Sequence, residues 1–307
     1  MSAKSGKSEI LLETGTNELE VMEFTIADRN FGINVAKVHE ILRYSDHPVT
    51  PMPNSNPFVE GVFKPRQMVI TVVNLPAYLG LPPSDGDKDI LIITNFNSNF
   101  TAFHVHSVVE IHRISWRDIE KPDPAIYSGQ EGLVTGIARN GEQLITIIDF
   151  ERILADINPA AGVKPSDIDR LGPRERSAKP ILIAEDSPLL ERMITEALDK
   201  AGYGNVTVTA NGQEAWDELA RLREQGGDIT DRVKMVITDI EMPVMDGHRL
   251  LRQIREDPAL SVLPVVIFSS LINDDMRLKG ERLGATAQIT KPEIGDLVGL
   301  IDRFILE

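Results

Sequence analysis

The sequence predicts two domains of different fold class, an all-β domain followed by an α/β domain with a doubly wound parallel sheet. Short apolar and β-branched runs recur before residue 157, a proline-containing segment occupies residues 158–178, and strand and helix patterns alternate from residue 179. A chain of 307 residues with 42% hydrophobic content is also long enough to build two cores.

The predicted first domain, residues 17–157, is dominated by strand patterns. These patterns cover residues 19–26, 67–74, 90–94, 101–106 and 143–148. A short helix is predicted over residues 34–41, because Val35, Val38 and Ile41 recur at a spacing that places them on one helical face. Residues 1–16 are predicted to form a flexible N-terminus.

Residues 158–178 are predicted to be an interdomain linker. Pro159, Pro165 and Pro173 block regular backbone pairing there, and few of the other residues could contribute to a core.

Five apolar strand patterns follow the linker, each succeeded by a helical pattern. The strands are expected at residues 181–184, 206–208, 233–238, 264–268 and 287–290, with helices beginning near Ser187, Gly212, Asp246, Asn273 and Glu293. This alternation is typical of parallel strands joined by crossover helices, so residues 179–307 are predicted to form a five-stranded doubly wound sheet.

Composition excludes several classes of function. The net charge of −15 argues against nucleic-acid binding, which needs clustered basic side chains. The absence of cysteine excludes thiolate chemistry and disulfides. Residues 1–8 lack the apolar segment of a secretory signal, and the apolar stretch 68–81 is too short to span a bilayer. We therefore expect a cytoplasmic protein without direct membrane insertion.

Polar residues with a shared chemistry follow four of the five predicted strands. They are Glu185, Asp186, Asp239, Ser269 and Lys291. Because the carboxyl ends of parallel strands meet at one edge of a sheet, these side chains are expected to lie close together. Two carboxylates about 4 Å apart repel by roughly 4 kcal/mol at an effective dielectric constant near 20, so Lys291 and a Mg²⁺ ion are the expected counter-charges. A carboxylate neutralised in this way can act as a nucleophile toward phosphorus.

Helix capping is the simpler explanation for Glu185 and Asp186. Acidic residues beside the helix predicted from Ser187 would be favourable for electrostatic reasons alone. The matching positions of Asp239 and Lys291 at other strand ends favour a reactive site instead.

The segments IAED, TDIEMPVMDG, FSS and TKPE closely resemble the receiver domains of two-component response regulators, over residues 179–307. The resemblance implies that Asp239 accepts a phosphoryl group from a histidine kinase and that Glu185, Asp186, Asp239 and the backbone carbonyl of Glu241 hold Mg²⁺. It also implies that Ser269 and Lys291 contact the phosphoryl group. Gln288 departs from the family pattern, because many receivers carry a switching aromatic residue at that position.

The first half offers no catalytic constellation. His104 and His106 could share a strand face, but no third metal ligand is suggested by the spacing, so metal binding by this pair is rejected. The segments VMEFTIADRNFGINVAKVHEIL, TPMPNSNPFVEGVFKPRQMVITVVNLPAYLGL and GEQLITIIDFERIL resemble the CheW family of chemotaxis adaptors. That resemblance implies a double β-barrel of two five-stranded sheets, with Arg66 and Glu40 as partner-binding residues.

An adaptor-like domain followed by a receiver resembles the CheV family of chemotaxis coupling proteins. The resemblance implies a non-enzymatic protein at receptor arrays on the inner membrane face, linking methyl-accepting chemoreceptors to the histidine kinase CheA under control of phosphorylation at Asp239. Two alternatives remain: a scaffold whose receiver only drains phosphate, and an aspartyl-phosphate-forming phosphatase. The second is disfavoured because the DxDx[TV] element is missing.

Overall fold

The computed structural model describes residues 17–66, 68–84, 88–96, 99–120, 133–158, 168, 175–270, 272, 274–291 and 293–305. Contacts divide the chain into two compact units, one built mainly from residues 18–159 and the other from residues 160–307. The N-terminus predicted to be flexible, residues 1–16, and most of the predicted linker lie outside the described residues.

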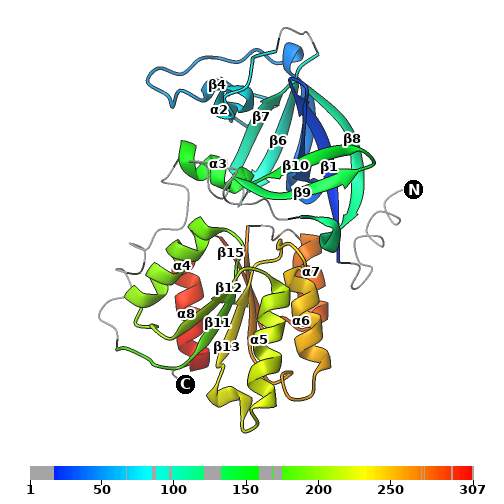
Figure 1. Cartoon of the computed structure of the whole chain (residues 1–307). Helices are drawn as coiled ribbons and strands as arrows, with labels where there is room; N and C mark the ends of the chain where they lie inside the picture. The colour runs from blue at the N-terminus through cyan, green and yellow to red at the C-terminus, as the bar shows by residue number, and fades with distance from the viewer. Residues whose placement is uncertain are drawn as a thin grey trace, which may run out of the picture. The chain divides into compact units, whose positions relative to one another are not determined.

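One five-stranded sheet of the first unit has the order β8-β1-β2-β10-β9 (Figure 1). Its strands are β1 (Glu18–Ile26), β2 (Arg29–Asn34), β8 (Ser107–Ser115), β9 (Val134–Asn140) and β10 (Gln143–Ile148). β1 and β2 form an antiparallel hairpin, as do β9 and β10, whereas β2 and β10 pair in parallel.

The other sheet of this unit has the order β3-β6-β7-β5-β4. Its strands are β3 (Val38–Arg43), β4 (Val59–Phe63), β5 (Ile70–Asn74), β6 (Ile90–Phe96) and β7 (Asn99–Val105). Here too a parallel pair, β5 with β7, joins two antiparallel pairs, β6 with β7 and β4 with β5. The two sheets repeat one pairing pattern, and the predicted all-β class with two five-stranded parts is confirmed.

An apolar cluster joins the two sheets. Phe24 of the first sheet and Phe103 of the second are both fully buried, and both contact Phe150 with ring centroids 6.1 Å and 4.7 Å away. Burying aromatic rings of this size is among the largest apolar contributions a side chain makes to a core.

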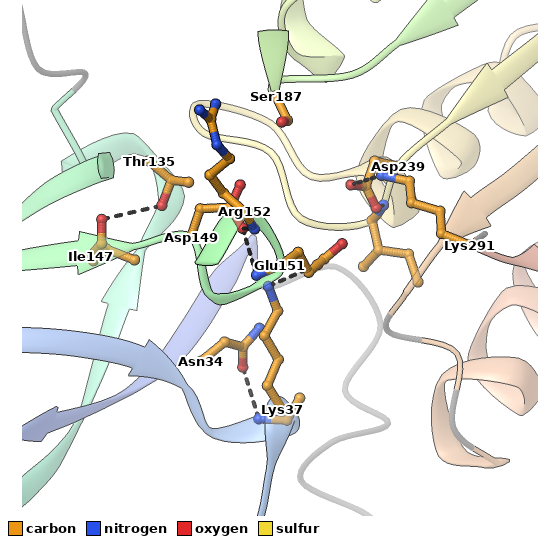
Figure 2. A network of polar contacts seen from close by, with 12 residues as sticks. Asn34, Lys37, Thr135, Ile147, Asp149, Glu151, Arg152, Ser187, Asp239 and Lys291 are labelled. Atoms are coloured by element: carbon orange, nitrogen blue, oxygen red, sulfur yellow. Dashed lines mark hydrogen bonds and ion pairs between the residues drawn. The ribbon is translucent and has the colours of Figure 1, made fainter. Parts of the chain in front are cut away.

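Two strands that take part in parallel pairs, β5 and β10, each lead into a capped helix. α2 (Leu75–Tyr78) begins after Asn74, whose side chain accepts a hydrogen bond from the amide of Ala77. α3 (Phe150–Ile157) begins after Asp149, whose side chain accepts from the amides of Glu151 and Arg152 (Figure 2). These caps satisfy backbone donors that have no partner within the helix.

The helix predicted over residues 34–41 is wrong. The structure has a 3-10 turn, η1 (Val35–Lys37), followed by the strand β3, which pairs antiparallel with β6. The side chain of Asn34 caps the turn by accepting from the amide of Ala36. Ile41 is 44% exposed, so the apolar spacing that predicted the helix does not mark one buried face. β-branched residues favour an extended backbone, and pairing with β6 decides the outcome.

The second unit is a five-stranded parallel sheet of order β12-β11-β13-β14-β15 with helices between successive strands (Figure 1). The strands are β11 (Ile181–Ala184), β12 (Val206–Thr209), β13 (Met235–Thr238), β14 (Val265–Ser269) and β15 (Ala287–Thr290). The helices are α4 (Pro188–Lys200), α5 (Gly212–Glu224), α6 (Gly247–Glu256), α7 (Asp274–Leu283) and α8 (Ile294–Ile305). The predicted doubly wound sheet is confirmed.

The sheet is extended in opposite directions from β11, because β12 lies on one side of β11 and β13 lies on the other. Ligands of such sheets bind at the carboxyl edge beside this change of direction. The central strands β11, β13 and β14 are buried along their whole length, which makes them a rigid support for the residues that follow them. Within the described part of the chain, none of the helices is long and apolar enough to cross a membrane.

Candidate functional site

The carboxyl edge of the parallel sheet gathers the predicted site residues. Glu185 and Asp186 directly follow β11, and Asp239 directly follows β13. Backbone hydrogen bonds fix these junctions, with the Asp239 amide donating to the Ala184 carbonyl at 3.0 Å and the Glu185 amide donating to the Thr209 carbonyl at 3.0 Å.

Ser269 and Lys291 complete the group from the neighbouring strands. Ser269 is the last residue of β14, and Lys291 follows β15 with its amide donating to the Ser269 carbonyl at 3.2 Å. Both side chains are buried, with relative exposures of 1% and 3%. The structure therefore brings five of the predicted residues to one edge.

Lys291 bridges two carboxylates. Its Nζ donates to Oε2 of Glu185 at 2.7 Å and to Oδ2 of Asp239 at 2.8 Å, and the second contact is drawn in Figure 2. Glu185 and Asp239 are themselves buried, at 2% and 8% exposure. Buried charges are tolerated when they are paired and hydrogen-bonded in this way.

Asp239 is held in its charged form by its surroundings. Burial on its own would raise the pKa of this carboxyl. The charge of Lys291, together with hydrogen bonds from Lys291, Ser269 and the Ile240 amide, outweighs burial and holds the pKa of Asp239 below its usual value. The Ile240 amide donates to Oδ1 of Asp239 at 2.6 Å. Asp239 is therefore ionised at neutral pH.

A tight turn after Asp239 returns the chain to α6. Gly247 lies so close to this turn that an added Cβ would come within 1.9 Å of the Asp239 carbonyl oxygen. Asp246 caps α6 by accepting from the Arg249 amide at 2.8 Å, and the Gly247 amide donates to the Ile240 carbonyl at 3.0 Å. Gly247 therefore packs closely against the turn that follows Asp239.

The donor set fits a divalent metal ion. One carboxylate oxygen each from Glu185, Asp186 and Asp239 lies within 4.8 Å of the other two. Three carboxylates face the single ammonium of Lys291, so these four side chains carry a formal charge of −2. Mg²⁺ prefers hard oxygen ligands and would neutralise that charge. The backbone carbonyl of Glu241, two residues beyond Asp239, stays a predicted ligand.

Gln288 of β15 does not lie with these five residues. Its Nε2 donates to the Arg277 carbonyl of α7 at 2.7 Å, and a Cβ added at Gly280 would lie 2.4 Å from its Oε1. The amide therefore fills space against α7, at the position where many receivers carry an aromatic ring.

In the first unit, the two predicted partner-binding residues lie next to each other. Arg66 Nη2 is 3.5 Å from Glu40 Oε1, and the Arg66 side chain is 86% exposed. Arg66 also has a φ of 58°, a left-handed backbone conformation that is uncommon outside glycine. Their role in binding stays a prediction.

His104 lies between two carboxylates. Its Nδ1 is 2.7 Å from Glu60 Oε1 and its Nε2 is 2.8 Å from Asp89 Oδ2, with Tyr44 stacked on the ring at 4.1 Å. Sequence reasoning considered His104 only with His106. The partners Glu60 and Asp89 could not be anticipated, because they come from other parts of the chain and their proximity depends on strand register.

The chain matches two protein-family models, the CheW-like domain over residues 20–158 and the response regulator receiver domain over residues 181–302. Helicobacter pylori chemotaxis protein CheV3 is 30% identical over 291 residues, covering 90% of this chain and 91% of its own. Chemotaxis protein CheV1 of the same species is 23% identical and covers 94% of both chains.

Two single-domain proteins match the separate halves. Thermotoga maritima chemotaxis protein CheW is 27% identical and covers 50% of this chain and 98% of its own. A solved receiver domain of a sensor histidine kinase from Pseudomonas aeruginosa, with a magnesium ion coordinated in its active-site cleft, is 24% identical with a TM-score of 0.37 and covers 43% of this chain and all of its own. With a CheW-like domain, a receiver domain and a CheV protein matched over nine-tenths of both chains, this chain belongs to the CheV family of chemotaxis proteins.

Proposed function

We propose that this chemotaxis protein couples chemoreceptors to the histidine kinase CheA and that phosphorylation of Asp239 regulates the coupling. The observation that carries the proposal is the ionised, buried Asp239 beside Lys291 and Ser269 at the carboxyl edge of a parallel sheet. The CheW-like domain of the same chain supplies the adaptor half of the proposal.

The proposed chemical step is a direct phosphoryl transfer. A carboxylate oxygen of Asp239 attacks the phosphorus of a phosphohistidine, the new P–O bond forms and the P–N bond to the departing imidazole breaks. Lys291 is positioned to offset the negative charge on the transferring group, and the Ser269 hydroxyl to donate a hydrogen bond to it.

A bound Mg²⁺ would supply further charge neutralisation for the phosphoryl oxygens. Glu185, Asp186 and Asp239 are the residues that would hold it.

The regulatory consequence follows from charge. A phosphoryl group adds about 1.5 to 2 negative charges at pH 7, and Lys291 is already shared between two carboxylates. Redistribution of its contacts, and of those made by Ser269, would change the surface of the receiver domain. That change would alter the grip of the chain on receptor or kinase.

The proposed partners place the chain in the cytoplasm, at receptor arrays on the inner face of the membrane. The proposed chemistry turns over only the chain's own phosphoryl group, so the protein is proposed not to be an enzyme toward other substrates. The exposed Arg66 and its half-buried ion-pair partner Glu40 are the proposed contact residues for receptor or kinase.

The direct test is transfer of label from radiolabelled phospho-CheA in the presence of Mg²⁺. The wild type should take up label, Asp239→Asn should not, and Asp217→Asn, at an exposed aspartate of α5, should behave as the wild type. Failure of the wild type to take up label would contradict the proposal. Repeated turnover of a small phosphoester such as p-nitrophenyl phosphate would instead favour a phosphatase.

A further inference from the structure

A second group of metal-ligand side chains lies in the first unit, on two strands of its first sheet. Glu23 belongs to β1, and Glu110 and His112 belong to β8. One ligand atom of each residue lies within 4.8 Å of the other two. Glu110 and His112 are two positions apart on β8, so they share one face of that strand.

Glu23 is a buried carboxylate on a strand of the core. It is 2% exposed and lies on the same face of β1 as Val21, which is fully buried. An isolated carboxylate in such a place costs several kcal/mol unless a positive charge compensates it. A bound divalent cation would supply such a charge.

One short hydrogen bond joins two of the three side chains. His112 Nε2 is 2.6 Å from Glu23 Oε2, a short hydrogen bond. The same nitrogen is 3.7 Å from Glu110 Oε1, which is too long for one. Both carboxylates therefore converge on a single nitrogen, and only one of them is hydrogen-bonded to it.

The distances match a cation at the centre of the group after small adjustments. In a tetrahedral zinc site with ligands about 2.1 Å from the metal, neighbouring ligand atoms lie about 3.4 Å apart. The observed 2.6 Å and 3.7 Å separations fall on either side of that value. The Glu110 side chain is 63% exposed and can move toward an ion, whereas the contact between His112 and the buried Glu23 would have to lengthen from 2.6 Å.

We propose that Glu23, Glu110 and His112 form a binding site for a divalent transition-metal ion such as Zn²⁺. One imidazole nitrogen and two carboxylate oxygens suit Zn²⁺ better than Mg²⁺, which prefers oxygen ligands throughout. The exposed side of Glu110 leaves room for water as a fourth ligand. A bound ion would link β8, an edge strand of its sheet, to β1.

The test uses the full chain carrying Asp239→Asn, in buffer with excess Mg²⁺, so that the receiver site does not contribute zinc binding. Zinc bound per chain is measured by equilibrium dialysis, and Co²⁺ is used separately to report ligand geometry by its visible absorption. The variants are His112→Gln, Glu110→Gln and, as a matched histidine control on an exposed position of β3, His39→Gln.

One zinc ion per chain is expected, with affinity reduced more than about 100-fold by His112→Gln and unchanged by His39→Gln. Glu110→Gln changes an exposed side chain, so its loss of affinity is not explained by unfolding. The melting temperature should also rise with zinc in the parent chain and not in His112→Gln. Absence of zinc binding at micromolar concentration, or equal binding by His112→Gln and the parent, would overturn the proposal.

Discussion

The ammonium nitrogen of Lys291 lies 2.8 Å from Oδ2 of Asp239, and both side chains are buried at the carboxyl edge of the parallel sheet. The same nitrogen also contacts Glu185 at 2.7 Å. Removing Lys291 would leave two buried carboxylates without this shared counter-charge. The contact is therefore structural in the resting protein as well as proposed to serve phosphoryl transfer.

Lys291→Met is expected to lower the free energy of unfolding of the receiver unit by about 3–5 kcal/mol, because it breaks a buried ion pair by removing one partner. Urea denaturation measures the change. Added Mg²⁺ should stabilise Lys291→Met more than the wild type, because the carboxylates then carry more uncompensated charge. Lys200→Met, at an exposed position of α4, should change stability by less than about 0.5 kcal/mol. Equal Mg²⁺ effects on Lys291→Met and wild type would contradict this account of the site.

Gly247→Ala is expected to destabilise the receiver unit by about 1–3 kcal/mol, because the added Cβ would come within 1.9 Å of the Asp239 carbonyl oxygen. Displacing that turn should also slow phosphorylation of Asp239. The matched control is Gly299→Ala in α8, where nothing lies within 4 Å of the added Cβ. There alanine should stabilise the helix by about 0.4–1 kcal/mol. Chemical denaturation measures whether the free energy of unfolding falls in Gly247→Ala and rises in Gly299→Ala. A stable, normally phosphorylated Gly247→Ala would show that the turn tolerates a side chain.

His104 is expected to make the stability of the first unit depend on pH. Burial on its own would lower the pKa of His104, but hydrogen bonds and charges from Glu60 and Asp89 outweigh it and raise the pKa above 6.5. A histidine whose pKa is raised by folding stabilises the fold fully below pH 6.5, and this contribution is lost as pH rises through the folded-state pKa.

The measurement is the difference in unfolding free energy between wild type and His104→Gln across this range. The difference should shrink as pH rises above 6.5, and a difference that grows would contradict the prediction. Burial raises the pKa of Asp149 to about 6, so the contribution of Asp149 to the free energy of unfolding changes mainly between pH 3.8 and about 6, below the range used for His104. His39→Gln is the control for loss of a histidine without these partners.

Arg66→Ala is expected to weaken binding to receptor or kinase by at least about tenfold, because exposed arginines are frequent binding hot spots. Its stability should change by less than about 1 kcal/mol, since its ion pair with Glu40 at 3.5 Å is exposed. Pull-down or calorimetric titration with CheA and a receptor fragment, alongside thermal melting, separates the two effects. Arg139→Ala, at an exposed position of β9, is the matched control. Unchanged affinity of Arg66→Ala for both partners would remove Arg66 from the proposed interface.

The receiver half is predictable from sequence because its strands are short, continuously apolar and each followed by a helix. A strand end fixes where the next polar residue lies, so the order of strands and helices along the chain is enough to place Glu185, Asp239 and Lys291 together. Asp246 was expected only to begin a helix, and its role as the cap of α6 depends on the geometry of the turn.

The adaptor half is harder to predict because its contacts depend on pairing between distant strands. Strands β2, β8 and β9 have mixed or weak apolar patterns and are not among the predicted strand patterns. Residues 34–41 have three apolar positions at helical spacing, yet pairing of β3 with β6 makes residues 38–41 extended. Glu23 and His112 are 89 positions apart, so no local pattern could have brought them together.

The central claim is that phosphorylation of Asp239 changes how this chain couples receptors to CheA. The most direct measurement is CheA autophosphorylation in a reconstituted mixture of receptor, kinase and this chain, with and without a beryllium fluoride phosphoryl mimic. We expect the chain to support receptor control of the kinase, and the mimic to change that control in the wild type and not in Asp239→Asn. Identical kinase output with and without the mimic, in a wild-type chain that still accepts phosphate, would contradict the claim and leave a scaffold whose receiver only drains phosphate.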